Sequence, residues 1–195
     1  MASAILSLSE WEKRYLLWLA RKAIAAAFAK RDFTPPEPPS PRLKEHLGVF
    51  VTLHESGQLR GCIGLVEGIK PLHQAVAEMA VAAAFQDPRF NPLQPEELDK
   101  IDLEISVLSP LKKIESVEEI QVGTHGLFIK KGYNRGLLLP QVATEWGWDR
   151  EVFLSQTCLK AGLSGDCWQD AETEIYIFSA EIFSEQEFNS ALPSV

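Results

Sequence analysis

The sequence predicts an α+β fold of about six mostly antiparallel strands with helices packed on them, built from two similar halves. The first observation behind this prediction is that the order hairpin, helix, strand occurs twice along the chain. The second is that the returning strand of each hairpin carries an Arg-Gly pair, at Arg60-Gly61 and at Arg135-Gly136. The third is the composition, 46% apolar and 24% charged, which is that of an ordinary soluble globular protein.

A long helix is expected at the start of the chain. Ser7 and Glu10 fit a capping box, in which each side chain bonds to the backbone of the other residue. The apolar positions that follow, up to about Lys30, form a wide face, so this helix should be mostly buried. Five prolines within the seven residues 35–41 then predict an extended connector, because proline continues neither helix nor sheet.

The first half is expected to begin with a hairpin. Gly48–Glu55 and Gln58–Leu65 are rich in β-branched and aromatic residues, and the Ser56-Gly57 pair between them is typical of a turn. Pro71 then opens a helix whose apolar residues have helical spacing. Ile101–Leu108 alternates strictly between apolar and polar residues and is expected to be a half-buried closing strand.

The second half repeats this plan. Leu127–Lys131 and Arg135–Leu139 predict a hairpin, Pro140 starts a helix, and Asp149 caps another that ends before Gly162. Residues 173–183 are expected to be the closing strand. The whole chain, 1–195, is therefore predicted to be one domain with these parts: the N-terminal helix (1–33), the Pro-rich connector (34–47), the first half (48–109), a connection (110–122), the second half (123–184) and a tail (185–195).

Charge and hydropathy exclude several classes of protein. The net charge of −8 argues against a nucleic-acid-binding protein, which needs a dense positive surface, although basic residues on the first helix leave a local patch open. The longest apolar runs, Ala23–Ala29 and Met79–Phe85, are too short to cross a membrane. A signal peptide is also unexpected, because Arg21-Lys22 interrupts the apolar stretch. These features predict a cytoplasmic protein.

The cysteines and histidines suggest no metal or cofactor. The three cysteines, Cys62, Cys158 and Cys167, include no C-x-x-C pair and are expected to be free thiols in a reducing cytosol. The four histidines are scattered without the spacing of metal ligands, so neither a metal nor a cofactor is predicted.

The segment Leu59–Gly64 is the most unusual part of the sequence. Glycine weakens a strand and often marks the close approach of another backbone or a ligand, so Gly61 and Gly64 need a reason. Alternation places Arg60 and Cys62 on one face, where the guanidinium would lower the pKa of the thiol. Alternatively, Cys62 is a small buried residue and Arg60 pairs with a carboxylate.

Two further groups are candidate site residues. With a two-residue turn, His54 should lie on the face opposite Cys62, whereas one extra residue would reverse this, so a Cys–His pair stays open. Asp87 and Arg89 follow the end of a helix, in a loop, where functional polar residues often lie. They are equally explained as a capping carboxylate with a structural ion pair.

Four motifs in this order, LRGCIG, DPRF, RGLLLPQVA and CLKAGL, resemble those of the AMME chromosomal region candidate gene protein family. The resemblance covers nearly the whole chain and implies two similar halves sharing one mostly antiparallel, barrel-like sheet with helices outside. The family has no established function. The resemblance also implies two partners, a Memo-type protein and a radical S-adenosylmethionine enzyme, which accompany similar prokaryotic proteins in a modification system.

The leading functional hypothesis is a catalytic or accessory subunit of this cytosolic system. Its catalytic candidates are Arg60, Cys62 and Asp87, in a cleft between the halves, with Cys62 as nucleophile or redox thiol. The candidates for ligand binding are Gly61, Gly64, Arg89, Arg135 and Lys160, although the helix dipole also explains Lys160. The alternatives are a non-catalytic protein-interaction module and a nucleic-acid-binding protein. The oligomeric state is left open.

Overall fold

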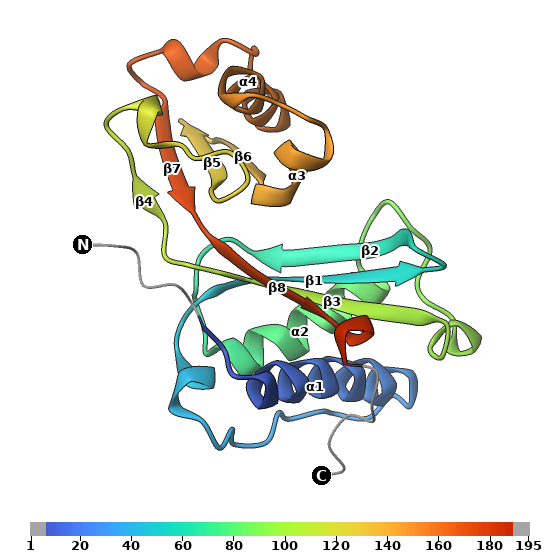
Figure 1. The fold of residues 1–195 in the computed structure, drawn as a ribbon. Helices are drawn as coiled ribbons and strands as arrows, with labels where there is room; N and C mark the ends of the chain where they lie inside the picture. The colour runs from blue at the N-terminus through green and yellow to red at the C-terminus, as the bar shows by residue number, and fades with distance from the viewer. Residues whose placement is uncertain (1–6, 189–195) are drawn as a thin grey trace. The chain divides into compact units, whose positions relative to one another are not determined.

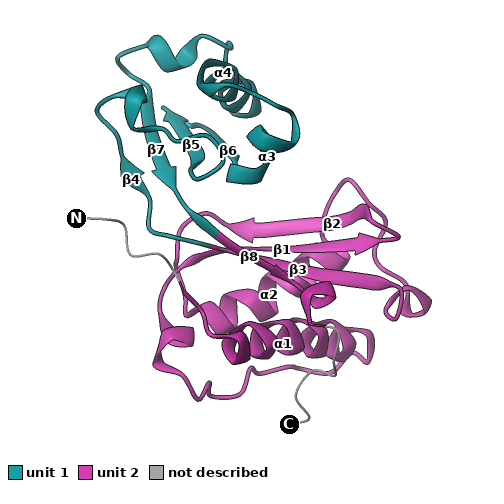
Figure 2. Ribbon diagram, viewed as in Figure 1, with its two compact units in different colours: residues 1–5, 108–180 teal, residues 6–107, 181–195 magenta. Residues whose placement is uncertain are grey.

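A computed structural model of the protein describes residues 7–188, which divide into two compact units (Figures 1 and 2). Unit 2, magenta in Figure 2, comprises residues 7–107 and 181–188, and unit 1, teal, comprises residues 108–180. Each unit has its own four-stranded sheet and its own hydrophobic core. Within the described residues, no helix is long and apolar enough to cross a membrane.

Unit 2 is a sheet with two helices on one face (Figure 1). The strand order is β2-β1-β3-β8, so β2 lies at one end of the sheet. Alternation along β1 buries Val49, Val51 and Leu53 completely, because this face packs against the helices. The elements are α1 (Glu10–Phe28), η1 (Pro41–Lys44), β1 (Gly48–Glu55), β2 (Gln58–Leu65), α2 (Leu72–Phe85), η2 (Pro95–Glu97), β3 (Ile101–Leu108), β8 (Ala180–Ser184) and η5 (Glu185–Glu187).

The predicted N-terminal helix is present, but its capping box lies two residues later than predicted. Ser9 caps α1, and its side chain accepts a hydrogen bond from the backbone N–H of Glu12. The Glu12 carboxylate in turn accepts from the N–H of Ser9, at 2.7 Å. Ser7 and Glu10 have the same spacing, so the local sequence alone does not distinguish the two boxes.

Unit 1 is a smaller sheet of order β4-β7-β5-β6. Its longer helix, α4, starts where predicted, because the Asp149 side chain accepts a hydrogen bond from the N–H of Val152. Phe153 and Leu154 are completely buried in the core of this unit. The elements are β4 (Lys112–Lys113), η3 (Val117–Glu119), β5 (Gly126–Lys131), β6 (Asn134–Leu138), α3 (Pro140–Glu145), α4 (Arg150–Lys160), η4 (Cys167–Gln169) and β7 (Glu174–Phe178).

The expectation of one shared, barrel-like sheet is wrong for the described residues, which form two separate sheets and no closed barrel. The predicted closing strand 173–183 is interrupted at Ser179, so that β7 and β8 belong to different sheets. Ser179 accepts a backbone hydrogen bond from the N–H of Ser109, but its own N–H donates to the Ser109 hydroxyl. A side-chain oxygen thus replaces a backbone acceptor where β7 ends. The parts predicted as 48–109 and 123–184 are accordingly not the two compact units, because β8 completes the first sheet.

The two sheets nevertheless have the same strand order. In each, the returning strand of the hairpin is at the end, followed by the first hairpin strand, the closing strand and a fourth strand. One helix follows the first hairpin and two follow the second. The predicted duplication stays a prediction, to which this order adds an observation.

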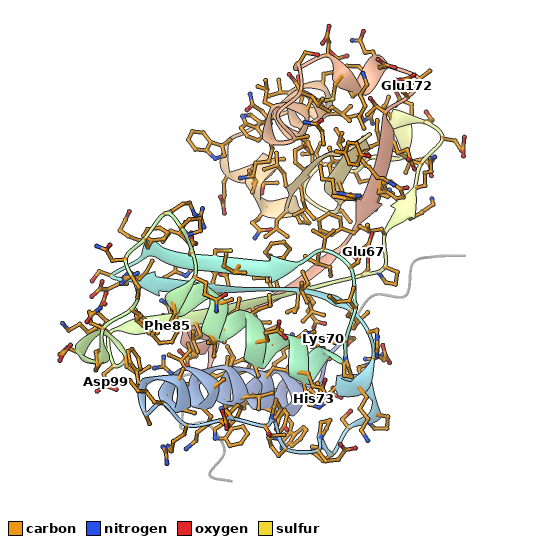
Figure 3. The ribbon with its side chains drawn as sticks, turned by 180° about the vertical axis from the view of Figure 1, so that it is seen from behind. Glu67, Lys70, His73, Phe85, Asp99 and Glu172 are labelled. Carbon is orange, nitrogen blue, oxygen red and sulfur yellow. A yellow bond between two sulfur atoms is a disulfide. The ribbon has the colours of Figure 1, made fainter. Side chains whose placement is uncertain are left out.

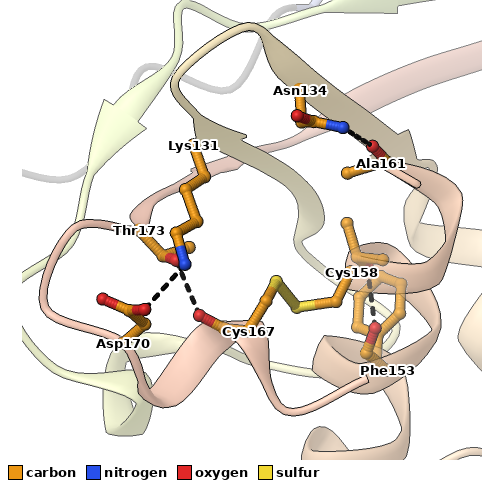
Figure 4. The surroundings of a disulfide bond; sticks show 9 residues. Lys131, Asn134, Phe153, Cys158, Ala161, Cys167, Asp170 and Thr173 are labelled. Atoms are coloured by element: carbon orange, nitrogen blue, oxygen red, sulfur yellow. Dashed lines mark hydrogen bonds and ion pairs between the residues drawn. A yellow bond between two sulfur atoms is a disulfide. The ribbon is translucent and has the colours of Figure 1, made fainter. Parts of the chain in front are cut away.

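The expectation of three free thiols is wrong, because Cys158 and Cys167 form a disulfide (Figure 4). After α4, Gly162 adopts a positive φ of 73° and the chain turns back towards the helix. This turn brings the two Cα atoms to 5.9 Å, within the usual range for a disulfide. The absence of a C-x-x-C motif therefore did not exclude a pair nine residues apart.

Candidate functional site

Two sets of side chains lie along the edge of unit 2, and we call them together the β2-edge cluster: Arg60 with Glu97, and Cys62 with Asp87 and Arg89. The guanidinium groups of both sets lie over the ring of Phe90. Arg60 and Cys62 are in β2, Asp87 and Arg89 follow α2, and Glu97 ends η2. The sequence had singled out four of them and missed Glu97. A long-range ion pair such as that of Glu97 leaves no local pattern in the sequence.

The hairpin contains a β-bulge at Arg60. Leu53 pairs with Gly61, but the next residue, His54, pairs with Leu59. Arg60 is therefore an extra residue in β2 with no partner in β1. A bulge of this kind breaks the alternation of side chains along its strand.

The bulge changes which side chains share a face with Cys62. Cross-strand partners point to the same side of a sheet, as do residues two apart in a regular strand. Thr52 pairs with Cys62, so His54, two residues further along β1, lies on the face of Cys62. The expectation for a two-residue turn is thus reversed, because the extra residue is in the strand. The same bulge removes the argument that alternation places Arg60 beside Cys62.

Asp87 is the most densely bonded member of the cluster. Its side chain is only 2% exposed and lies against a 52% exposed Arg89 side chain. Asp87 Oδ1 accepts from the backbone N–H and the Nε of Arg89, and Oδ2 accepts from Arg89 Nη2 at 2.7 Å. Oδ2 also accepts from the backbone N–H of Cys62, at 2.9 Å. The hydrogen bonds from Arg89 hold the pKa of Asp87 well below its usual value. Asp87 is therefore a poor general base near neutral pH.

Arg60 is paired with a carboxylate, as in the structural alternative. Its Nε and Nη2 donate to the two carboxylate oxygens of Glu97, at 2.7 and 3.0 Å. Nη1 donates to the backbone carbonyl of Asn91, at 3.1 Å. This bidentate pair is largely shielded from solvent, with 14% and 19% of the two side chains exposed. Three of the five N–H groups of the guanidinium are thus engaged by the protein itself.

Cys62 is a half-buried thiol and the one cysteine outside the disulfide. The Thr52 hydroxyl lies 3.2 Å from its sulfur and is placed to donate a hydrogen bond to it. Burial raises the pKa of Cys62, although the Thr52 hydrogen bond and the Arg89 charge act in the opposite direction. The expected lowering of this pKa is therefore wrong, and the resting thiol is mainly protonated at neutral pH.

The two glycines of the motif are explained by packing inside unit 2. A Cβ on Gly61 would lie 2.3 Å from the backbone carbonyl oxygen of Ala83 in α2. A Cβ on Gly64 would lie 2.4 Å from the ring of Phe50. Both distances are far shorter than carbon contacts allow. The close approach that the glycines permit is that of a helix and of an aromatic ring.

The cluster covers part of the open edge of the sheet. Because β2 is a terminal strand, every second N–H and C=O of its backbone points away from β1. At Cys62 these two groups are satisfied by side chains: Asp87 accepts from the N–H, and Arg89 Nη2 lies 3.4 Å from the carbonyl oxygen. The loop after α2 thus takes the place of a further strand at this one position.

The remaining ligand candidates, Arg135 and Lys160, belong to unit 1 and not to the β2-edge cluster. Arg135 is exposed in β6 and Lys160 is exposed in the last turn of α4. The glycine after Arg135, Gly136, has the same role as Gly61, since its Cβ would lie 2.6 Å from the carbonyl oxygen of Thr157 in α4. The repeated Arg-Gly pair therefore marks a strand that packs closely under a helix.

The described part of the chain holds no group of three or more histidine, cysteine or acidic side chains that could bind a metal ion. The features that the edge of unit 2 offers are a thiol, ion pairs and a partly covered strand edge.

The fold and the cluster place the chain in the α+β class with antiparallel sheets, and its L-R-G-C-I-G strand is covered at one position of its edge by the D-P-R loop. The sequence model of the AMMECR1 family matches residues 17–183, and the chain belongs to this family. A protein from Methanothermobacter thermautotrophicus is 50% identical over 186 residues, covering 91% of this chain and 96% of the relative. Protein TK0174 from Thermococcus kodakarensis is 50% identical over 188 residues, 91% of each chain.

A solved structure has the same fold. The crystal structure of the uncharacterized protein PH0010 from Pyrococcus horikoshii is similar with a TM-score of 0.85 and 45% sequence identity. The match covers 91% of this chain and 92% of that protein. The fold described above is therefore shared with an experimentally determined relative.

Proposed function

We propose that this protein is a non-catalytic accessory subunit that binds partner proteins in a cytosolic modification system. The observation that carries the proposal is that the β2-edge cluster satisfies its own charges. Arg60 is bound to Glu97, Asp87 is bound to Arg89 and to the backbone, and burial raises the pKa of the Cys62 thiol. Such a cluster fixes the shape of a surface, whereas catalysis by a thiol needs an accessible thiolate and a free base.

The partners we propose are a Memo-type protein and a radical S-adenosylmethionine enzyme, which accompany similar proteins in prokaryotes. The test is binding of the intact chain to each partner, purified from the same organism, by isothermal titration calorimetry. Wild type and Cys62→Ala should bind with the same affinity, because the thiol has no chemical role. The proposal would be contradicted if the chain bound neither of the two partners.

A second candidate function, a thiol enzyme, has one observation in its favour, which is that His54 shares the face of Cys62. Alkylation of the native protein with iodoacetamide at a series of pH values separates the two functions. An accessory subunit should react slowly, with a pKa above the value of about 8.5 for a free cysteine. A pKa below this value in wild type, returning towards it in His54→Ala, would establish an activated thiol and refute the accessory role.

A further inference from the structure

The covered edge of β2 continues into an open one. Phe50 pairs with Gly64 two residues along from the pair of Thr52 with Cys62, so the two pairs have the same hydrogen-bonding geometry. The N–H and C=O of Gly64 therefore point away from β1, as those of Cys62 do. At Cys62, Asp87 and Arg89 bind the outward N–H and C=O. At Gly64, no group within residues 7–188 is hydrogen-bonded to the outward N–H or C=O.

This open edge lies in a groove of about 840 Å³ within unit 2. Ile63, Gly64 and Leu65 of β2 form one side, and the end of α1 with residues 31–35 forms the other. Residues of α2 lie between them, and Lys70 and Phe85 are labelled near the two ends of this helix in Figure 3. The groove has the volume of a site for a small ligand or a short peptide.

The side chains of the groove suit an apolar, extended occupant. Ala77 and Val81 are one helical turn apart on α2, and both line the groove. Because both side chains are small, the groove has room over this part of α2 for an extended polypeptide that continues the sheet beside β2. Charged side chains, including Arg31, Asp32 and Glu78, also line it, so apolar and charged groups occur together as at protein interfaces.

We propose that the groove binds an extended, mainly apolar peptide segment of a partner protein, which adds to the sheet as a strand beside β2. This inference rests on the accessory role proposed above and specifies how a partner is bound. Gly64 would exchange backbone hydrogen bonds with the peptide at the ordinary interstrand spacing of about 4.8 Å. Alternate side chains of the peptide would lie on Ala77 and Val81. The Asp87–Arg89 pair would limit the added strand at one end, because it already occupies the edge at Cys62.

A polypeptide is favoured over other occupants because the site offers a donor and an acceptor of the main chain, side by side, on a strand edge. Peptide backbone is complementary to such an edge, and exposed edges recruit strands. A second copy of this chain could also present a strand edge. The oligomeric state distinguishes this second copy from a partner peptide, since pairing of two β2 strands would make a dimer.

The first test uses amide hydrogen exchange of the free protein by NMR. Ile63, whose N–H points towards β1, and Cys62, whose N–H is bound to Asp87, serve as internal controls. Gly64 should exchange much faster than both. Equal protection of Gly64 and Cys62 in a monomer would overturn the proposal, because it would show that the edge is already occupied. A dimer on light scattering, with Gly64 protected, would overturn it in favour of self-association.

The second test selects binders from a phage-displayed library of random dodecapeptides on the intact chain. Peptides should bind Val81→Arg at least about tenfold more weakly than wild type, because the new side chain fills the groove. Val152→Arg, the same change at an exposed valine of α4, is the matched control and should bind as wild type does.

A third measurement leaves the protein unchanged, in case Val81→Arg does not fold. N-methylation of a selected peptide at successive positions should abolish binding at alternate residues only, the pattern of an added strand. No selected peptide, equal binding to Val81→Arg, or no effect of N-methylation would each overturn the groove proposal. None of these results affects calorimetric binding of the Memo-type and radical S-adenosylmethionine proteins, which tests the accessory role separately.

Discussion

Replacing Asp87 by asparagine tests whether the carboxylate holds the edge of unit 2 together. Asparagine keeps the shape of the side chain, but its NH₂ group must face a donor, either the N–H of Cys62 or the guanidinium of Arg89. Breaking a buried ion pair costs about 3–5 kcal/mol, and a lost hydrogen bond to a charged group about 1.5–3 kcal/mol. Because the Arg89 side chain is 52% exposed, water replaces part of what is lost. We therefore expect a loss of about 2–3 kcal/mol in the free energy of unfolding.

The effect should depend on pH in a defined direction. The pKa of Asp87 is lowered in the folded state, so its contribution is fully present above the pKa of about 4 of an unfolded aspartate. The contribution is lost as the pH falls below that value, because the unfolded state then binds a proton that the folded state does not. The difference in stability between wild type and Asp87→Asn should thus be constant from pH 6 to 8 and narrow below about pH 4.

Urea unfolding followed by circular dichroism at pH 7 and pH 3 measures both quantities. Asp32→Asn, an exposed aspartate of the same unit, is the matched control and should change stability by less than about 0.5 kcal/mol. The reasoning is refuted if Asp87→Asn is as stable as Asp32→Asn, or if the difference between wild type and Asp87→Asn is as large at pH 3 as at pH 7.

Two further predictions concern packing and redox state. Gly61→Ala should lower the free energy of unfolding by about 2–3 kcal/mol, because the new methyl group meets the Ala83 carbonyl of α2. Gly132→Ala is the control: nothing lies within 4 Å of its new methyl group, so it should lose only about 1 kcal/mol, from its positive φ. Thermal unfolding in which Gly132→Ala is the less stable variant would contradict the packing explanation. Thiol titration of the denatured, unreduced protein should find one free thiol, Cys62. A count of three would show that the disulfide is not formed in the isolated protein. Reduction of the disulfide should destabilise unit 1 by about 2.5 kcal/mol.

Local signals predicted most of the individual elements. Both strands of the first hairpin and the strand 101–108 have the bounds expected from alternation and turn residues, and Asp149 caps α4 as expected. These features depend on residues close in sequence, where propensity and periodicity act directly. The position of the first capping box was missed because two equally good boxes lie two residues apart.

The features that the sequence did not predict depend on distant residues. The bulge at Arg60 shifts the register inside a strand. The adjacent Gly61 is a residue type that can mark a bulge, but it equally indicates close packing, so it did not decide the register. The pairing of Arg60 with Glu97 and the division of the last strand between two sheets depend on where the chain returns in space. The pKa of Cys62 was expected to fall because Arg60 was placed beside it, whereas burial dominates and Arg60 is engaged elsewhere.

The position of unit 1 within the chain has a consequence for folding during synthesis. Unit 1 is inserted between β3 and β8, which are neighbours in the sheet of unit 2. The ribosome therefore makes β1, β2 and β3 early, but the edge of β3 stays unpaired until unit 1 has been made and β8 has emerged. Phe183, completely buried in the core of unit 2, and Glu185, which binds Arg21 and the N–H of Leu103, arrive last. Unit 2 thus has contacts of high sequence separation, which slow folding, and its nascent chain needs protection from aggregation until the C-terminal segment is added.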